Sequence, residues 1–375
     1  MQIADAWLTA IPGRGQDMLL VVVETDDGLK GLGEVGVRTS SAVSRATLGH
    51  LYEVLIGTDA SRIEHLWQVL SRGDFFPADR SAAAVISAID IALWDLRAKA
   101  FGVPLHELIG GRVRDHVTCY THVHPEGHDT DAVVAGARRL VEEGWRHLRL
   151  VVPTAGDVLE PRQAMRVAIE QFHAVRDAVG NDIELIIDAH TRLDPPEAVT
   201  LCREIESARP YFVEDAVRSE DLEAYRMLRW RTGVPLAAGE QLTSKWQFRP
   251  LIEADLIDYA RIDLGIAGGI TEARKIAAMA EAHHIKIATH NPLGPVSTAA
   301  AMHFNLACTN FGIQEMPPAP AHKAINHPHS LTQGTLTAPR LPGLGVELTP
   351  TKTETPGTPA RTPQLRRLDG SFTNW

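Results

Sequence analysis

The feature that most constrains the fold of this chain is a series of six short apolar segments, each of which ends in a titratable residue. These terminal residues are Asp188, Glu214, Glu240, Asp263, His290 and Glu315, so successive ones lie 23 to 27 residues apart. That distance accommodates one strand, one helix and two short loops. Because amphipathic stretches separate the segments, the pattern predicts repeated βαβ units and a parallel sheet.

Two earlier apolar segments, ending near His124 and Val151, bring the number of expected strands to eight. Eight such strands predict an α/β protein with a closed (β/α) barrel between about residues 113 and 315. In barrels of this type the active site forms at the carboxyl ends of the strands. We therefore interpret the residues that end these segments as candidate site residues.

The region before the barrel, residues 1–111, begins with strand-like runs and continues into helices. Its clearest helix is expected from about Ala82 to Phe101, where apolar residues recur at steps of three and four. The Gly-Val-Pro sequence that follows should end this helix.

The region after the barrel is rich in proline, and its one strand-like run extends from Pro339 to Leu348. We expect this tail to return and pack on the first region. The predicted division of the chain is therefore residues 1–111, residues 112–320 as the barrel, and residues 321–375 as the returning segment.

Composition is that of an ordinary globular protein, with 375 residues, of which 44% are hydrophobic and 22% charged. The net charge of -10 and the scattered Lys and Arg residues argue against a nucleic-acid partner. The chain start has no basic stretch followed by an apolar run, and no early run could span a bilayer. Three widely spaced cysteines indicate neither a disulfide framework nor a zinc site. We expect a cytoplasmic protein with no membrane partner.

Three of the strand-terminal residues, Asp188, Glu214 and Glu240, are carboxylates on consecutive strands. Such a cluster is unfavourable unless a hard cation lies among the oxygens. We predict one Mg²⁺ per active site, held by these three residues. The alternative is that each carboxylate is an independent loop cap or a surface ion-pair partner.

The other strand ends supply candidate acid and base groups. His290 and Asp263 end adjacent strands and resemble a base dyad, in which the carboxylate fixes the imidazole tautomer. His190 follows Asp188 by two residues, so if the strand continues both side chains face the same side and His190 is a candidate acid. Glu315, as a protonated carboxylic acid, could donate a hydrogen bond to the oxygen of a developing enediolate opposite the metal. The alternatives are a core histidine, a solvated loop histidine and a buried ion pair, respectively.

Substrate contacts are less constrained by the sequence. His122 and His124 end the first barrel strand, Arg149 lies in the second, and Arg14 and Arg38 belong to the first region. All five are candidate substrate-binding residues. Phe75-Phe76 is a further candidate for substrate selection.

Several segments together resemble the mandelate racemase and muconate lactonizing enzyme family of the enolase superfamily. They are Ala88–Leu96, Lys99–Leu105, Leu108–Gly111, Gly268–Ile270 and Pro342–Gly345. The resemblance covers nearly the whole chain. It implies an α+β N-terminal capping domain, completed by the C-terminal tail, over a modified (β/α)7β TIM barrel that often forms multimers. It also implies Mg²⁺ at the residues matching Asp188, Glu214 and Glu240.

The residues at the positions of the catalytic bases indicate which subgroup of the family the chain resembles. Racemases and lactonizing enzymes of this family place Lys-x-Lys at the second strand, where this chain has His147-Leu-Arg-Leu150. Asp188-x-His190 and the segment beginning at His290 are similar to galactonate dehydratase and related acid-sugar dehydratases. Other motifs, Glu214-Asp215 and Asn310–Glu315, resemble mannonate dehydratases, although the loop after the second strand is short.

This resemblance implies dehydration of a sugar acid to a 2-keto-3-deoxy acid through an enediolate. In that scheme His290 takes the α-proton, the metal and Glu315 hold the enediolate, and His190 protonates the leaving hydroxyl. Two other functions stay open: a racemase or epimerase that uses both histidines, and a non-catalytic binding or regulatory protein. A metal-dependent hydrolase ranks below them, because its site would contain several histidine ligands.

Overall fold

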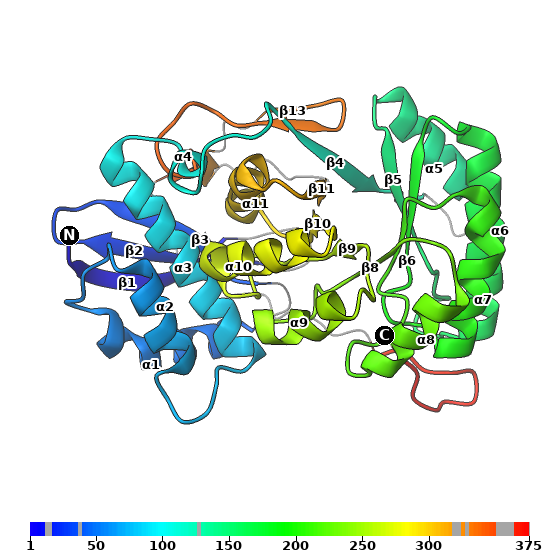
Figure 1. Ribbon diagram of the computed structural model, residues 1–375, viewed down its shortest axis with the longest axis horizontal. Helices are drawn as coiled ribbons and strands as arrows, with labels where there is room; N and C mark the ends of the chain where they lie inside the picture. Colours follow the sequence, from blue (N-terminus) through cyan, green and yellow to red (C-terminus); the bar gives the residue numbers. More distant parts are fainter. Residues whose placement is uncertain are drawn as a thin grey trace.

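Eight parallel strands close into a barrel, shown in a computed structural model that describes residues 1–11, 17–36, 40–125, 129–316, 324–326, 330–349 and 364–374 (Figure 1). The barrel strands are β4 (Val117–His122), β5 (His147–Val151), β6 (Glu184–Asp188), β7 (Phe212–Glu214), β8 (Leu236–Ala238), β9 (Tyr259–Ala260), β10 (Lys286–Thr289) and β11 (Phe311–Glu315). Each strand pairs with the next, and β11 pairs with β4 to close the ring.

A helix follows each of the first seven barrel strands. These helices are α5 (Thr130–Glu142), α6 (Pro161–Val179), α7 (Pro195–Ile205), α8 (Leu222–Arg231), α9 (Lys245–Glu253), α10 (Gly269–Ala282) and α11 (Pro295–Ala307). Within the described ranges no helix follows β11. A 3-10 turn, Glu206–Ala208, extends α7, and the short α4 (Leu105–Leu108) leads into the barrel. The predicted (β/α)7β barrel is confirmed.

Successive side chains along the barrel strands point alternately outward and inward, so they form two separate apolar cores. Side chains that point outward pack against the helices, while a second cluster fills the interior of the barrel. The interior cluster consists of Tyr120, Ile186, Phe212, Ala237, Tyr259, Ala288 and Ile313, which come from seven different strands. This layer is the floor beneath the strand ends.

The N-terminal domain combines a three-stranded antiparallel sheet with three helices, as predicted (left in Figure 1). Its elements are β1 (Ile3–Ile11), β2 (Met18–Thr25), β3 (Lys30–Glu34), α1 (Ser41–Leu55), α2 (Ile63–Arg72) and α3 (Arg80–Phe101). β2 reads as a continuous apolar run because both faces are covered: Leu19 and Val21 join the core of this domain, whereas Leu20 and Val22 join the larger core shared with the barrel.

Helix α3 starts two residues before the predicted start at Ala82. Its N-cap is Asp79, whose side chain accepts a hydrogen bond from the backbone N–H of Ala82 at 2.8 Å. Gly102 ends the helix in the left-handed conformation, with φ of 67°, as the sequence predicts. Most of the helix is buried, since it lies between the sheet and the barrel.

The capping domain docks on the start of α10. Gly268 donates through its backbone N–H to Ser87 Oγ at 2.9 Å and accepts from Trp67 Nε1 at 2.8 Å. Thr271 N donates to Asp90 Oδ2 at 3.0 Å. Gly269 has φ of +73°, and a Cβ there would lie 2.3 Å from Asp90 Oδ2, so glycine permits this close approach.

The C-terminal segment contacts both domains, and not the capping domain alone as expected. Its elements are β12 (Ile325–Asn326), β13 (Ser330–Thr332), β14 (Thr335–Thr337) and β15 (Glu347–Leu348). β14 pairs with Val117 and Thr118 of β4, which extend beyond the partners of β4 inside the barrel. These otherwise unpaired backbone groups attract the hairpin to the barrel.

Only part of this segment reaches the capping domain, where Leu344 N donates to Asp95 Oδ1 of α3 at 2.7 Å. Residues 364–374 instead lie on the barrel, where Leu159 N donates to the backbone oxygen of Arg366 at 3.0 Å. We keep the predicted limits 1–111, 112–320 and 321–375 as a proposed division.

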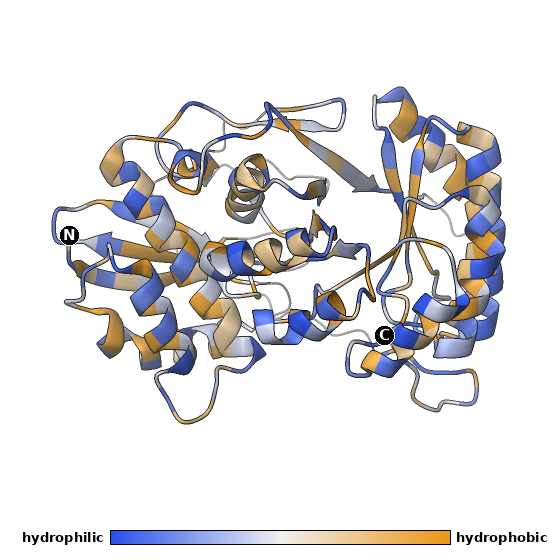
Figure 2. Ribbon diagram, viewed as in Figure 1, coloured by the Kyte–Doolittle hydropathy of each residue, from blue (hydrophilic) through white to orange (hydrophobic). Residues whose placement is uncertain are grey.

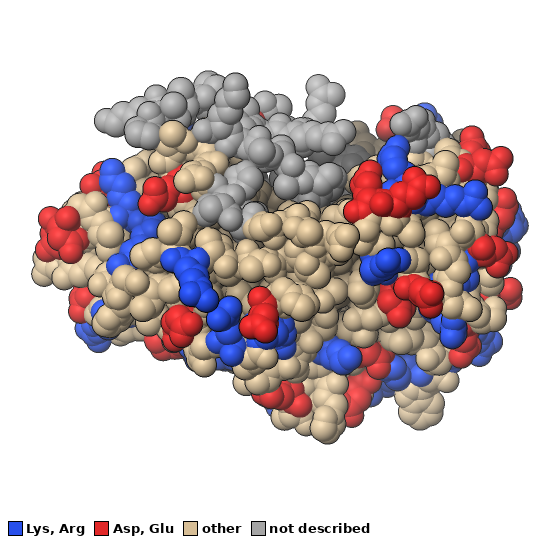
Figure 3. All heavy atoms as spheres, turned by 90° about the horizontal axis from the view of Figure 1, so that it is seen from above, with Lys and Arg blue, Asp and Glu red and all other residues tan. Residues whose placement is uncertain are grey.

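Figure 2 shows apolar residues on the strands and on the inward faces of the helices, with polar residues outward. Acidic and basic side chains are interspersed over the face drawn in Figure 3. Among the described residues, no helix has the length and apolarity needed to cross a membrane.

Candidate active site

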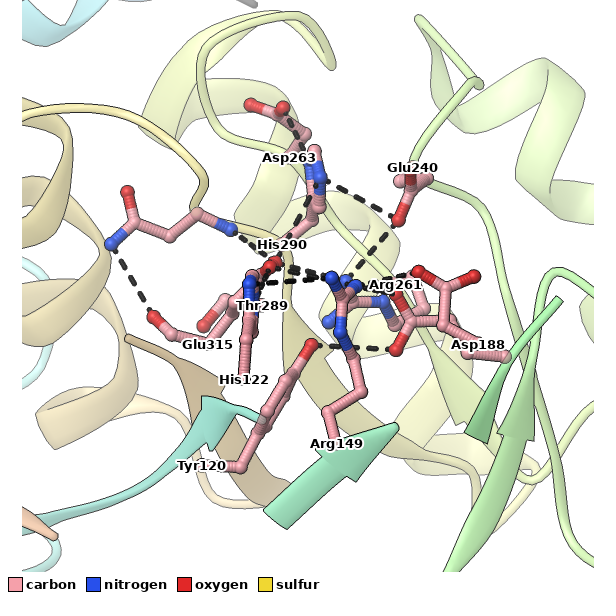
Figure 4. A network of polar contacts seen from close by, with 12 residues as sticks. Tyr120, His122, Arg149, Asp188, Glu240, Arg261, Asp263, Thr289, His290 and Glu315 are labelled. Carbon is pink, nitrogen blue, oxygen red and sulfur yellow. Dashed lines mark hydrogen bonds and ion pairs between the residues drawn. The ribbon is translucent and has the colours of Figure 1, made fainter. Parts of the chain in front are cut away.

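The candidate site lies next to the interior layer of the barrel, two residues further along each strand toward its carboxyl end. Side chains two residues apart on a strand face the same side. The residues that follow the layer in this way are His122 after Tyr120, Asp188 after Ile186, Glu214 after Phe212, Arg261 after Tyr259, His290 after Ala288 and Glu315 after Ile313. The site residues therefore converge because the strand alternation continues to the barrel mouth (Figure 4).

The predicted dyad forms as expected from the adjacent strand ends. Asp263 and His290 share an isolated β-bridge, and His290 Nδ1 lies 2.7 Å from Asp263 Oδ2. The other ring nitrogen, Nε2, faces Glu240 Oε2 at 3.5 Å and Glu315 Oε2 at 3.8 Å. Burial lowers the pKa of His290, but Glu240, Glu315 and Asp263 together raise it to about 9.

Two buried guanidinium groups connect the carboxylates. Arg149 Nη1 donates to Asp188 Oδ2 at 2.6 Å and to Glu214 Oε1 at 3.2 Å. Arg261 Nη2 donates to Glu214 Oε1, Glu240 Oε2 and Glu315 Oε2 at 2.7, 3.2 and 3.0 Å. Burial lowers the pKa of both arginines, but the surrounding carboxylates outweigh it and raise both values. Both therefore stay charged.

The protonation of His122 follows from its two partners. Arg149 Nη2 lies 3.3 Å from His122 Nδ1, and because a guanidinium can only donate, Nδ1 is the acceptor. The proton of the neutral ring is then on Nε2, which donates to Glu315 Oε1 at 2.7 Å. Burial, followed by the charge of Arg149, lowers the pKa of His122 to about 4, which agrees with a neutral ring.

Glu315 is surrounded by donors, whereas the sequence-based expectation is a protonated group that donates a hydrogen bond. It accepts from His122, from Arg261 and from the backbone N–H of Asn291, the last at 3.0 Å. Burial raises its pKa, but His290, Arg261 and His122 hold it well below the usual value. Glu315 is therefore the acceptor in each of these contacts.

His190 reaches the site by a different route from the one expected. β6 ends at Asp188, and His190 lies in a turn with φ of +49°, so the strand does not continue. The turn nevertheless brings His190 Nε2 to 2.9 Å from Asp188 Oδ2. Asp188 Oδ1 accepts the backbone N–H of His190 at 2.7 Å, which stabilises the turn.

Carboxyl groups outnumber guanidinium groups in this site. Six of them gather here, Asp188, Glu214, Asp215, Glu240, Asp263 and Glu315, beside Arg149 and Arg261. Burial raises the pKa of Glu214 to about 8 and that of Asp215 well above its usual value. The charge of these acids is thus incompletely compensated by the cations of the chain.

This donor set fits a hard dication such as Mg²⁺, which takes carboxylate oxygens. Asp188 and Glu214 end β6 and β7 and are fully buried, and Glu240 follows the end of β8 by two residues. Among the described residues, no three His, Cys, Asp or Glu side chains are already close enough to hold an ion. The guanidinium groups of Arg149 and Arg261 lie between the carboxylates.

The residues predicted to contact the substrate lie in different surroundings in the structure. Arg149 is only 8% exposed and belongs to the carboxylate network. The ring of His124 lies 5.6 Å from that of His122, in an exposed position. Arg14 and Arg38 lie outside the described residues. Phe75-Phe76 is an exposed pair on the capping domain.

Two residues that bind the site carboxylates, Arg261 and Tyr120, were not among the site residues predicted from the sequence. Tyr120 donates through its hydroxyl to Glu214 Oε2 at 3.4 Å. Arg261 precedes Asp263 by two residues, and an arginine inside a run of apolar strand residues was the available signal. A charge there must have buried partners.

An α+β cap on a (β/α)7β barrel, with acidic strand ends at its mouth, is the architecture of the enolase superfamily. Residues 8–110 match the mandelate racemase/muconate lactonizing enzyme N-terminal domain, and residues 132–352 match the enolase C-terminal domain-like family. The chain belongs to the mandelate racemase/muconate lactonizing enzyme family of this superfamily.

Named relatives cover nearly the whole chain. The D-mannonate dehydratase of Caulobacter sp. (strain K31) is 36% identical over 100% of both chains. The D-galactonate dehydratase of Ralstonia pickettii (strain 12J) is also 36% identical, over 95% of this chain and 96% of that protein. The crystal structure of an enolase from Pantoea ananatis with bound D-gluconate and Mg has a TM-score of 0.91 and 28% identity, covering 100% of this chain and 99% of that one.

Proposed function

We propose that the protein is a Mg²⁺-dependent hydro-lyase that converts a sugar acid, an aldonate or aldarate, into a 2-keto-3-deoxy acid. The observation that carries this proposal is the His290–Asp263 pair, in which Asp263 holds Nδ1 and leaves Nε2 facing the carboxylate cluster. The relatives named as D-mannonate and D-galactonate dehydratases support the substrate class. Cytoplasmic location and assembly into a homo-oligomer stay predictions from the sequence.

Asp188, Glu214 and Glu240 would hold the metal ion. When bound, Mg²⁺ stabilises the negative charge that collects on the substrate carboxylate as the neighbouring proton leaves. The bound Mg of the Pantoea ananatis structure supports a metal at this site.

The acid and base roles follow from the side chains of this chain. The base is the neutral form of His290, which accepts the α-proton at Nε2, since Nδ1 is engaged by Asp263. Glu240 contributes to the raised pKa of His290, and a cation on this carboxylate would offset that effect and favour the neutral ring. His190 supplies the proton with which the β-hydroxyl leaves as water. Arg149 and its neighbour His122 would contact the oxygens of the acid, while Glu315 would orient His122 and Arg261.

The test is a screen of the purified protein with Mg²⁺ against hexonic, pentonic and aldaric acids, with 2-keto acid formation as the readout. We expect product from one or a few acids, none with His290→Asn, and none after the metal is removed by a chelator. Exchange of the α-proton without water loss would indicate a racemase or epimerase instead. Binding of an acid with neither exchange nor product would indicate a non-catalytic protein.

A further inference from the structure

Glu34, the last residue of β3, connects the capping domain to the loop that carries His290. It is fully buried, and its carboxylate crosses the boundary between the domains. Oε1 accepts the backbone N–H of Gly294 at 2.7 Å, and Oε2 accepts that of Ser297 at 2.9 Å. Glu34 therefore caps the first turn of α11, whose own N-cap residue, Gly294, has no side chain to do so.

The capped turn is the far end of a short loop. His290 ends the preceding segment, and only Asn291, Pro292 and Leu293 separate it from Gly294. Asn291 fixes the near side, because its side-chain Nδ2 donates to Thr298 Oγ1 at 2.9 Å and its backbone N–H donates to Glu315 Oε2. The loop is thus fastened by the barrel at one end and by Glu34 at the other.

The same strand end also touches the loop of the second dyad member. A Cβ on Gly36 would lie 2.6 Å from the backbone oxygen of Gly265, and Gly265 N donates to Asp263 Oδ1 at 2.7 Å. A Cβ on Gly294 would lie 2.8 Å from Glu34 Oε1. Glycine at both positions lets the end of β3 approach both loops of the dyad.

The buried environment of the Glu34 carboxylate indicates that this residue holds its backbone partners in position. Burial raises its pKa to about 7, so keeping a carboxylate here costs free energy. No Lys or Arg ion pair with Glu34 is found among the described residues; its charge is stabilised by backbone N–H groups at a helix N-terminus. An amide or an apolar residue would fill the same space without that cost.

We propose that Glu34 is a positioning residue, which fixes the start of α11 and thereby the orientation of His290 toward the substrate. The role in catalysis rests on the proposed function; the effect on the ring of His290 does not. A displacement of about 1 Å in a reacting group can lower a rate by about 10²-fold, so a residue outside the site can govern turnover.

The main variant is Glu34→Gln, which keeps the shape but leaves one acceptor oxygen for two N–H donors. We expect kcat to fall by about 10- to 100-fold while KM changes by less than about threefold, because the substrate contacts are elsewhere. Glu24→Gln is the matched control, since Glu24 lies in the same sheet with a surface partner, Lys30, at 3.5 Å. It should leave kcat unchanged.

A second readout does not require turnover. In protein labelled with ¹⁵N-histidine, the ring signals of His290, assigned with His290→Asn, should shift in Glu34→Gln and stay in place in Glu24→Gln. If Glu34→Gln does not fold, Glu34→Asp, which keeps the charge but shortens the reach, takes its place.

Unchanged ring signals, or a lower melting temperature with an unchanged kcat, would overturn the positioning role. Shifted ring signals in Glu34→Gln, together with a wild-type protein that turns over no acid, would instead support the positioning role and contradict the proposed function. The two claims can therefore fail separately.

Discussion

His290 and Asp263 follow the neighbouring strands β10 and β9 and share a β-bridge, and the imidazole Nδ1 of His290 lies 2.7 Å from Oδ2 of Asp263. This contact selects the nitrogen that is left to act as a base. Replacement of Asp263 by Asn removes the charge and allows the amide to hold the ring in the other tautomer. We expect kcat to fall by about 10²-fold or more, within the range contributed by general base catalysis, with little change in KM. A steady-state rate within about threefold of wild type would show that the dyad is not catalytic.

Metal binding should depend on the three strand-terminal carboxylates. We expect Asp188→Asn and Glu240→Gln each to weaken Mg²⁺ binding by at least about tenfold in calorimetry, because each removes a charged oxygen ligand. Glu253→Gln, which changes an exposed acid paired with Arg249, is the control and should bind as wild type does. Equal affinity in all variants would refute this assignment.

Arg261 should be essential for stability, because it is fully buried against three carboxylates. Arg261→Met removes the buried cation that these three carboxylates share, and we expect the free energy of unfolding to fall by about 3–5 kcal/mol. Arg249→Met removes a mostly exposed ion pair and should cost less than about 1 kcal/mol. Denaturant unfolding of both variants without added metal measures the difference, and similar losses would contradict the prediction.

Asp90 should make the interface between the domains sensitive to pH. Burial raises its pKa from 3.8 to about 7, so the folded protein holds a proton that the unfolded chain has released. Stability from this group is therefore present at low pH and is lost as the pH rises toward and past 7. We expect the melting temperature to fall more between pH 5 and pH 8 in wild type than in Asp90→Asn. The same fall in both proteins would be evidence against the shift.

The barrel and most of its site could be predicted because most barrel strands are apolar runs that end in a polar residue or are closely followed by one. Alternation then places Asp188, Glu214, His290 and Glu315 on one side without any knowledge of the loops. The protonation of Glu315 could not be predicted, because it depends on donors from three other segments.

The contacts of Arg261, Glu34 and the C-terminal segment could not be predicted, because each joins residues that are far apart in the sequence. Arg261 reads as an interruption of an apolar strand until its partners are visible. Glu34 reads as an ordinary strand end, although its partners lie 260 and 263 residues away. The C-terminal segment joins the barrel because β4 extends past its neighbouring strands. The amino-acid composition does not show that one strand is longer than its neighbours.

The central claim is that His290 removes the α-proton of a sugar acid that then loses water. Proton NMR in deuterium oxide with Mg²⁺, comparing wild type with His290→Asn on the acid found by the screen, tests it most directly. In wild type we expect the α-proton signal to disappear as 2-keto acid forms with deuterium at C3, whereas His290→Asn should show neither change. Loss of the α-proton signal without product, or equal rates in the two proteins, would contradict it.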